Sequence, residues 1–458
     1  MPGYYLENFG CRATQSDGAS LERQLQARGY NRCDSPGNAD IVILNTCTVT
    51  AAADIDARSA IRRNHRENPN SKILVTGCYA QRAPEEIAGL TGVSCVVGNS
   101  HKHLIPDIVS DLVPVLPENF IGLEKVQLSA PAFTVISDIF AHTELIAAPV
   151  FEGESIAEKT RPNLKVQDGC NNRCSFCIIP SVRGQSRSMK LDRVIEEAKA
   201  MVAAGYREIV LSGINLGRWG RDLEPAPSRF EMLIRALLEY TDVQKIRISS
   251  VEPMDWSDEL ISLVAGSPRI AKHAHVPLQS GSDHILRRMH RKYRPWHYAE
   301  KIRKIREAMP DAAIGADVMV GFPGETEELF EESRSFIEHL PFTYLHVFTY
   351  SSRPGTGSAA MADQVPVQIA RERNRVLRGL AANKNLDFRK SFVGRELDVV
   401  TLHTGGGAST EALSDNYLKV RVAGRRAANE MIKVAVTEMS DEGLVAVAQQ
   451  ENFIAHSL

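Results

Sequence analysis

Apolar residues in the first third of the chain form short runs that alternate with stretches of helical periodicity. The runs cover residues 4–9, 40–45 and 72–76, and we expect helices at 17–28, at 51–65 and after Pro84. Strands that alternate with helices imply a parallel sheet with helices on both faces. We therefore predict a three-layer parallel-sheet domain at residues 2–140, followed by a linker at 141–160.

The middle of the chain repeats the strand–helix alternation. Strands are expected at 163–168, 208–211, 245–249, 274–277, 313–320 and 344–348, with helices such as 191–204 and 229–240 between them. Six β-α repeats predict an open, partial (β/α)6 barrel at residues 161–389. Such a barrel binds its ligands at the carboxyl ends of its strands.

The last part of the chain changes to alternation with a period of two. Strands are expected at 396–402, 417–422, 431–437 and 444–448, with glycine-containing turns between them. This pattern predicts a small antiparallel β-barrel of the OB-like kind at residues 390–455. Barrels of this kind often bind RNA, and Lys419 and Arg421 are among the positive charges offered here.

Composition excludes some classes of protein. A chain of 458 residues implies several domains, and a net charge of −2 means that nucleic acid must be bound by local basic patches. We find no secretory signal and no apolar run long enough to span a membrane. Eight cysteines in so long a chain fit a reducing compartment, so we expect a cytoplasmic protein.

Three cysteines, Cys170, Cys174 and Cys177, lie at the spacing C-x3-C-x2-C. Structural zinc sites usually take four protein ligands, and ferredoxin clusters also use four cysteines. An iron–sulfur cube held by three thiolates keeps one iron open to another ligand. The spacing therefore favours a catalytic cluster, and the alternative is an incomplete zinc site.

Three further cysteines, Cys11, Cys47 and Cys78, each follow the end of a predicted strand. Because the carboxyl ends of parallel strands lie along one edge of a sheet, the fold would bring these thiols together. A second three-thiolate site is plausible, and the alternative is that the cysteines are small buried hydrophobes. We interpret Cys33 and Cys95 as structural.

The C-x3-C-x2-C segment resembles the motif of the radical S-adenosylmethionine (SAM) enzymes, and Phe176 fits the aromatic residue usual before the third cysteine. The resemblance implies that Cys170, Cys174 and Cys177 hold a catalytic [4Fe-4S] cluster whose open iron is chelated by SAM. It also implies that residues after the barrel strands lie near SAM, namely Phe176, Ser212, Gly213, Ser249 and Gln279.

Sequence blocks around the other three cysteines resemble the N-terminal domain of the methylthiotransferases. They are residues 8–12, 45–50 and 77–81, and the C-terminal part resembles the TRAM RNA-binding domain. The resemblance implies that Cys11, Cys47 and Cys78 hold an auxiliary [4Fe-4S] cluster. The chain departs from the family at Thr14, where Asn is common, which puts the surroundings of Cys11 in question.

Residues 45–50, 77–81 and 213–217 look most like the branch that modifies N6-threonylcarbamoyladenosine beside the tRNA anticodon, at position 37. The resemblance implies that a radical formed from SAM removes hydrogen from C2 of the adenine, that sulfur is inserted there, and that a second SAM supplies the methyl group. The anticodon stem-loop, an electron donor and a sulfur source would be partners, with no DNA or membrane.

Alternatives to this function are the same reaction on isopentenyladenosine or on a ribosomal-protein aspartate, and a non-catalytic iron–sulfur protein that binds RNA or senses redox state. Cations and aromatic residues mix at residues 287–297, so we expect RNA contacts from Arg291, Lys292 and Arg294. Arg183 and Arg187 could bind phosphate or a SAM carboxylate, or belong to a solvated loop. His273 and His275 are interpreted as ordinary strand residues.

Overall fold

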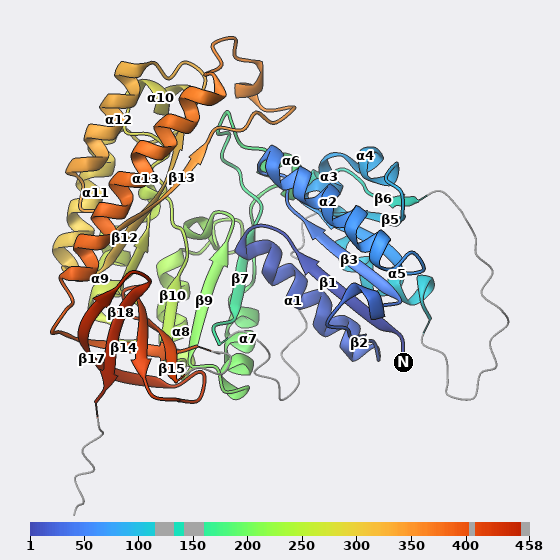
Figure 1. The fold of residues 1–458 in the computed structure, drawn as a ribbon, viewed down its shortest axis with the longest axis horizontal. Helices are drawn as coiled ribbons and strands as arrows, with labels where there is room; N and C mark the ends of the chain where they lie inside the picture. Colours follow the sequence, from blue (N-terminus) through green and yellow to red (C-terminus); the bar gives the residue numbers. More distant parts are fainter. Residues whose placement is uncertain (115–131, 142–159, 403–407, 450–458) are drawn as a thin grey trace, which may run out of the picture.

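The computed structural model describes residues 1–114, 132–141, 160–402 and 408–449. It contains a parallel sheet at the N-terminus, a strand–helix barrel in the middle and a closed small barrel at the C-terminus (Figure 1). The predicted mixed α/β fold class is thus confirmed. The predicted linker at 141–160 lies almost wholly outside the described residues.

The N-terminal sheet has six parallel strands in the order β2-β1-β3-β4-β5-β6. Its strands are β1 (Gly3–Asn8), β2 (Asn31–Arg32), β3 (Ile41–Thr46), β4 (Lys72–Gly77), β5 (Val93–Gly98) and β6 (Phe133–Val135). Its helices are α1 (Arg12–Ala27), α2 (Ala51–Glu67), α3 (Cys78–Arg82), α4 (Pro84–Ala88) and α5 (Ile105–Leu112). Separate apolar clusters cover the two faces, as expected for three layers.

The central barrel is an open arc of six parallel strands. They are β7 (Asn163–Asp168), β9 (Glu208–Gly213), β10 (Lys245–Ile248), β11 (His273–His275), β12 (Ala313–Val320) and β13 (Tyr344–Thr349). A short antiparallel strand, β8 (Arg187–Ser188), pairs with the end of β7. Two sheets, β10-β9-β7-β8 and β11-β12-β13, are joined by a bridge between Ile246 and Ile270.

Helices cover the outside of this arc. Apart from α6 (Ile179–Arg183), which packs against α3 of the N-terminal part, they are α7 (Leu191–Ala203), α8 (Phe230–Tyr240), α9 (Asp258–Gly266), α10 (Asp283–Arg288), α11 (Pro295–Ala308), α12 (Glu327–His339) and α13 (Val367–Lys390). Ile314, Ala316 and Val318 of β12 pack into the apolar core shared with these helices. Since side chains alternate along a strand, the residues between them face the interior of the arc.

The C-terminal barrel is closed in the order β14-β15-β16-β18-β17. Its strands are β14 (Glu396–Thr401), β15 (Ser409–Ser414), β16 (Lys419–Ala423), β17 (Met431–Ser440) and β18 (Gly443–Ala448). The expectation of a wholly antiparallel barrel is wrong at one place, because β16 and β18 are parallel. That pairing closes the barrel and leaves no exposed strand edge.

Candidate active site

Cys170, Cys174 and Cys177 lie in the loop that follows β7, at the carboxyl end of the barrel strands. The hydrogen bonds to these thiols are donated to sulfur: Cys170 Sγ accepts from Asn172 N at 3.4 Å and from Asn215 Nδ2 at 3.5 Å. Burial raises the pKa of Cys177 to about 12, so a metal must replace the proton for this residue to ligate as thiolate. A ring of donors around sulfur fits ligating thiolates.

Arg291 contacts this loop and does not lie on an RNA-binding surface. Its side chain is buried, and Nη1 donates to Cys174 Sγ at 3.2 Å while Nη2 pairs with the carboxylate of Glu252. Our expectation that Arg291 contacts RNA is therefore wrong, because the guanidinium is buried and bonded to groups inside the protein. Lys292 is exposed, whereas Arg294 is partly buried and pairs with Asp283 at 3.2 Å.

Cys11, Cys47 and Cys78 follow β1, β3 and β4 along one edge of the N-terminal sheet. Gly10 adopts a φ of 96°, and a Cβ there would lie 2.7 Å from Cys47 Cβ, so the loop before Cys11 lies directly on Cys47. Burial raises the pKa of Cys47 to about 12, and the neighbouring thiols of Cys78 and Cys11 raise it further. The prediction that the fold gathers these three thiols is confirmed.

The spacing of the sulfur atoms distinguishes a cluster from a single ion. Tetrahedral zinc with Zn–S bonds of about 2.3 Å would hold thiolate sulfurs about 3.8 Å apart. In the described part of the chain, neither cysteine triplet has all its sulfur atoms within 4.8 Å of one another. A cubane spreads its terminal ligands more widely than one ion does, so these sulfur positions do not favour a single zinc ion over a cluster.

The two triplets are neighbours in space, although they belong to different parts of the chain. Cys78, at the start of α3, packs against Ile178 and Val182 of the segment that follows Cys177. Asn99 ties them together, since its Nδ2 donates to Val182 O at 2.8 Å and lies 3.5 Å from Cys78 Sγ. The N-terminal sheet and the barrel are therefore packed closely against each other at this point.

The residues expected near SAM all lie at strand ends around the Cys170 loop. Phe176 stacks edge-on against Phe322 with ring centroids 6.5 Å apart, and Ser212 and Gly213 end β9. Ser249 follows β10, and Gln279 has a left-handed backbone with φ of 68° beside β12. Their contact with SAM stays a prediction.

Gln167 organises this region, and sequence reasoning missed it. Its Nε2 donates to Asp168 O and Gly169 O, each at 2.8 Å, and its Oε1 accepts from Asn215 N at 2.7 Å. The amide thus fixes the loop before Cys170 relative to the loop after β9. Its place near the end of a strand, three residues before Cys170, was the available signal.

A polar group on the inner face of the arc was also missed. Asp317 Oδ1 lies 3.2 Å from His275 Nε2 and 3.3 Å from His346 Nδ1, and His275 Nδ1 lies 2.9 Å from Tyr344 Oη. Burial opposes ionisation, but the two imidazoles hold the pKa of Asp317 well below its ordinary range. His275 is thus more than an ordinary strand residue, and its alternation with apolar neighbours on an inner face was the signal.

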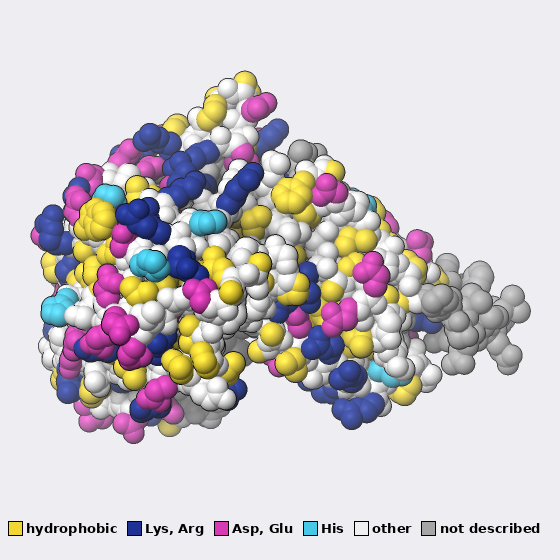
Figure 2. Space-filling model, turned by 90° about the horizontal axis from the view of Figure 1, so that it is seen from above, with side chains coloured by type: hydrophobic (Ala, Val, Ile, Leu, Met, Phe, Trp, Pro, Cys, Tyr) yellow, Lys and Arg dark blue, Asp and Glu magenta, His cyan; other side chains and the backbone are white. Residues whose placement is uncertain are grey.

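Positive charge is offered on two surfaces. Lys419 and Arg421 are exposed on β16 and line a hollow with Arg161 and Tyr417, although Arg421 also pairs with Glu442. Viewed onto the strand ends, Lys and Arg side chains gather over the barrel half of the molecule (Figure 2). Among the described residues, no helix is both long and apolar enough to cross a bilayer.

An open strand–helix arc with a three-cysteine loop after its first strand defines the radical SAM class of protein. Residues 164–337 match the Radical SAM superfamily, and residues 3–98 match Uncharacterized protein family UPF0004. A solved methyltransferase of the same class, TsrM from Kitasatospora setae, matches with a TM-score of 0.55 and 15% identity, over 78% of this chain and 77% of that one. This likeness shows the fold.

Sequence relatives identify the family. Threonylcarbamoyladenosine tRNA methylthiotransferase MtaB of Aquifex aeolicus is 35% identical over 94% of this chain and 99% of its own length. The protein of that name from Bacillus subtilis is 37% identical over 91% and 89%. The tRNA-2-methylthio-N(6)-dimethylallyladenosine synthase of Thermobifida fusca is 33% identical over 95% and 83%. The chain belongs to the radical SAM tRNA methylthiotransferases, in their threonylcarbamoyladenosine branch.

Proposed function

We propose that this enzyme adds a methylthio group to C2 of N6-threonylcarbamoyladenosine at tRNA position 37, using two [4Fe-4S] clusters and SAM. The observation that carries the proposal is the meeting of two cysteine triplets across α6, in a chain that matches a relative of that name over 99% of the relative's length. One triplet suits SAM cleavage and the other suits sulfur delivery, and the reaction needs both beside one base.

Cys170, Cys174 and Cys177 would hold the SAM-binding cluster, and Cys11, Cys47 and Cys78 would hold the auxiliary one. When bound, these groups and SAM supply the radical, the sulfur and the methyl group. The chain's own residues orient and shield them. Gln167 fixes the loop that carries Cys170, and Arg291 places a positive charge against Cys174.

The inner face of the barrel would receive the target base. His275, Asp317 and His346 offer donors and an acceptor there, in a position below the strand ends that carry the SAM residues. A base reaches such a site only when it leaves its stack, which is how proteins read RNA loops. The hydrogen-bond chain from Asp317 through His275 to Tyr344 would hold these side chains in one orientation.

The tRNA would lie across the two positive surfaces. Lys292 is exposed, Arg294 is partly buried, and Lys419 and Arg421 are on the C-terminal barrel, so the proposed contacts are to phosphates of the anticodon stem-loop. An electron donor and a sulfur source must come from other components of the cell. We propose the cytoplasm as the site of action, since the named relatives act on tRNA and cysteines stay reduced there.

The test is an anaerobic assay with purified protein, reconstituted with iron and sulfide, and given SAM and a strong reductant. Two transcript-derived tRNAs with the same anticodon stem-loop are compared, one carrying N6-threonylcarbamoyladenosine and one carrying N6-dimethylallyladenosine. We expect 2-methylthio product from the first by nucleoside mass spectrometry. Product from the tRNA that carries N6-dimethylallyladenosine alone would leave the reaction standing and overturn the choice of substrate. That alternative substrate stays open because of the 33% identical synthase.

A further inference from the structure

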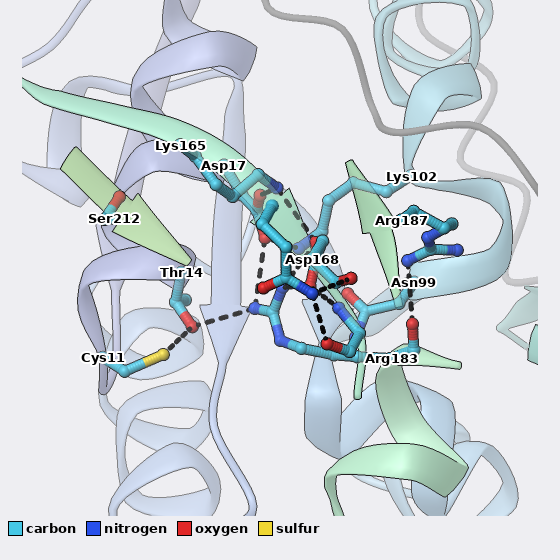
Figure 3. Close-up of polar contacts among 12 residues, drawn as sticks. Cys11, Thr14, Asp17, Asn99, Lys102, Lys165, Asp168, Arg183, Arg187 and Ser212 are labelled. Carbon is cyan, nitrogen blue, oxygen red and sulfur yellow. Dashed lines mark hydrogen bonds and ion pairs between the residues drawn. The ribbon is translucent and has the colours of Figure 1, made fainter. Parts of the chain in front are cut away.

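A buried network of charges lies between the N-terminal sheet and the barrel (Figure 3). Asp17 of α1 pairs with Lys102 at 3.1 Å, with Arg183 at 3.2 Å and with Lys165 of β7. Asp168 completes it, with Lys165 Nζ at 3.0 Å and Arg183 Nη1 at 3.0 Å from its carboxylate. All five side chains are at most 5% exposed.

Arg183 therefore contacts neither solvent nor a free phosphate, and both readings left open by the sequence are wrong for it. Its neighbour Arg187 is partly buried and donates to Arg183 O at 2.8 Å. The guanidinium of Arg183 instead turns toward the N-terminal thiol site. Nη2 donates to Thr14 Oγ1 at 3.3 Å, and Thr14 Oγ1 lies 3.6 Å from Cys11 Sγ (Figure 3).

The charges in this network do not balance. Three cations, Lys102, Lys165 and Arg183, face two carboxylates, so one positive charge is left over among buried side chains. An uncompensated buried charge is strongly unfavourable. Within the described part of the chain, Arg183 Nε also has no hydrogen-bond partner.

A cluster bound in the adjoining thiol site would supply the missing negative charge. An oxidised [4Fe-4S] core held by three thiolates carries one net negative charge, and its reduced form carries two. Burial lowers the pKa of Lys102, and the nearby Cys78 thiolate is one of the groups that oppose this. Asp168 first, and then Cys78, Asp17 and Cys11, likewise raise the pKa of Arg183 against the effect of burial.

We propose that this network is the counter-charge of the auxiliary cluster, and that Arg183 is a positioning residue that sets the cluster's reduction potential through Thr14. The inference rests on the proposed function, which places that cluster on Cys11, Cys47 and Cys78. It also accounts for Thr14, whose hydroxyl forms the link between Arg183 and Cys11 where the family commonly has Asn. Because Asp17 and Lys102 come from the N-terminal sheet and the other members come from the barrel, the cluster's charge is balanced only when the two are in contact.

The sign of the effect can be predicted. Reduction adds negative charge to the cluster, so a nearby cation favours the reduced form and raises the potential. Arg183→Met removes that cation and should shift the potential to more negative values. Asp168→Asn removes an anion from the same network and should shift it to more positive values. A role in folding alone would not give opposite shifts from two members of one network.

The experiment uses the full chain with Cys170, Cys174 and Cys177 replaced by Ala, so that only the auxiliary cluster is present. After anaerobic reconstitution, iron and sulfide content are measured, and the potential is titrated by electron paramagnetic resonance. Arg183→Lys is the matched control, because it keeps the charge and loses the two-pronged contact with Asp168.

Opposite shifts in Arg183→Met and Asp168→Asn, with the potential largely kept in Arg183→Lys, support the inference. Equal potentials, or shifts in one direction, overturn it and leave the proposed function standing. If Arg183→Met loses the cluster, retention in Arg183→Lys supports the inference and loss from both overturns it. A parent chain that binds no cluster, with Cys11, Cys47 and Cys78 intact, overturns the auxiliary site and with it the proposed function.

Discussion

Replacing Arg291 by Met separates a role at the cluster loop from a role in RNA binding. Arg291 lies 3.2 Å from Cys174 Sγ and pairs with Glu252. A hydrogen bond to a charged partner contributes about 1.5–3 kcal/mol, and removing one member of a buried pair costs about 3–5 kcal/mol. Since the Glu252 side chain is still 23% exposed, water takes over part of its solvation.

We therefore expect Arg291→Met to destabilise the native arrangement of the cluster loop by about 3 kcal/mol. This corresponds to a factor of roughly 100 in the population of that arrangement. We expect loss of iron from this loop, or a fall in 5′-deoxyadenosine formation by that order. The double variant Arg291→Met/Glu252→Gln should recover part of the loss, because it leaves no unpaired carboxylate behind. Burial raises the pKa of Glu252, and Arg291 opposes that shift.

Binding of tRNA to Arg291→Met should be unchanged, in affinity and in salt dependence, because the guanidinium does not reach the surface. Lys292→Met is the matched control: it is the next residue and is exposed. If Lys292 contacts a phosphate, its loss should reduce the salt slope by roughly 1 and weaken binding. A reduced slope for Arg291→Met with normal SAM cleavage would refute our placement of this residue.

Four further outcomes are expected. Cys174→Ala should abolish SAM cleavage, whereas Cys47→Ala should keep it and make no methylthio product; chromatography of 5′-deoxyadenosine and of nucleosides checks both. Asp17→Asn should lower the unfolding midpoint at pH 7 but approach wild type in acid, because lysine and arginine partners hold the pKa of Asp17 below its unfolded value of about 3.9. The stability that the Asp17 carboxylate supplies is thus present above its unfolded pKa and is lost as the pH falls below it. Denaturation at pH values between 7 and 3 tests this. Asp317→Asn should reduce product formation while SAM cleavage continues, since Asp317 lies on the inner face and pairs with His275 and His346; equal loss of both would contradict this. Lys419→Glu should weaken tRNA binding with little effect on SAM cleavage, and unchanged binding would remove β16 from the RNA surface.

Sequence pattern predicted the strands that carry the cysteines, because each is a short apolar run followed by glycine or threonine and a thiol. It missed β15, residues 409–414, in which Ala412 and Leu413 are the only apolar residues among Ser, Thr and Glu. It also placed the start of α1 at residue 17, whereas the helix begins at Arg12 with Cys11 as its N-cap. Polar residues early in that helix hid the first turn.

The cysteine ligands of the site could be predicted from the sequence, but the residues that surround them could not. Cysteine spacing and position after strands are local properties that the sequence displays. The burial of Arg291 and the pairing of Asp17 with Lys165 depend on how distant segments pack. A basic residue beside aromatic residues has the same composition on an RNA surface and beneath a cluster loop, and tertiary structure decides between them.

The most direct test of the account is nucleoside mass spectrometry of tRNA from cells that lack this gene, complemented with the wild-type chain or with Cys47→Ala. The account predicts that 2-methylthio-N6-threonylcarbamoyladenosine is absent without the gene, restored by the wild-type chain and not restored by Cys47→Ala. Unchanged levels of that nucleoside in cells without the gene would contradict it.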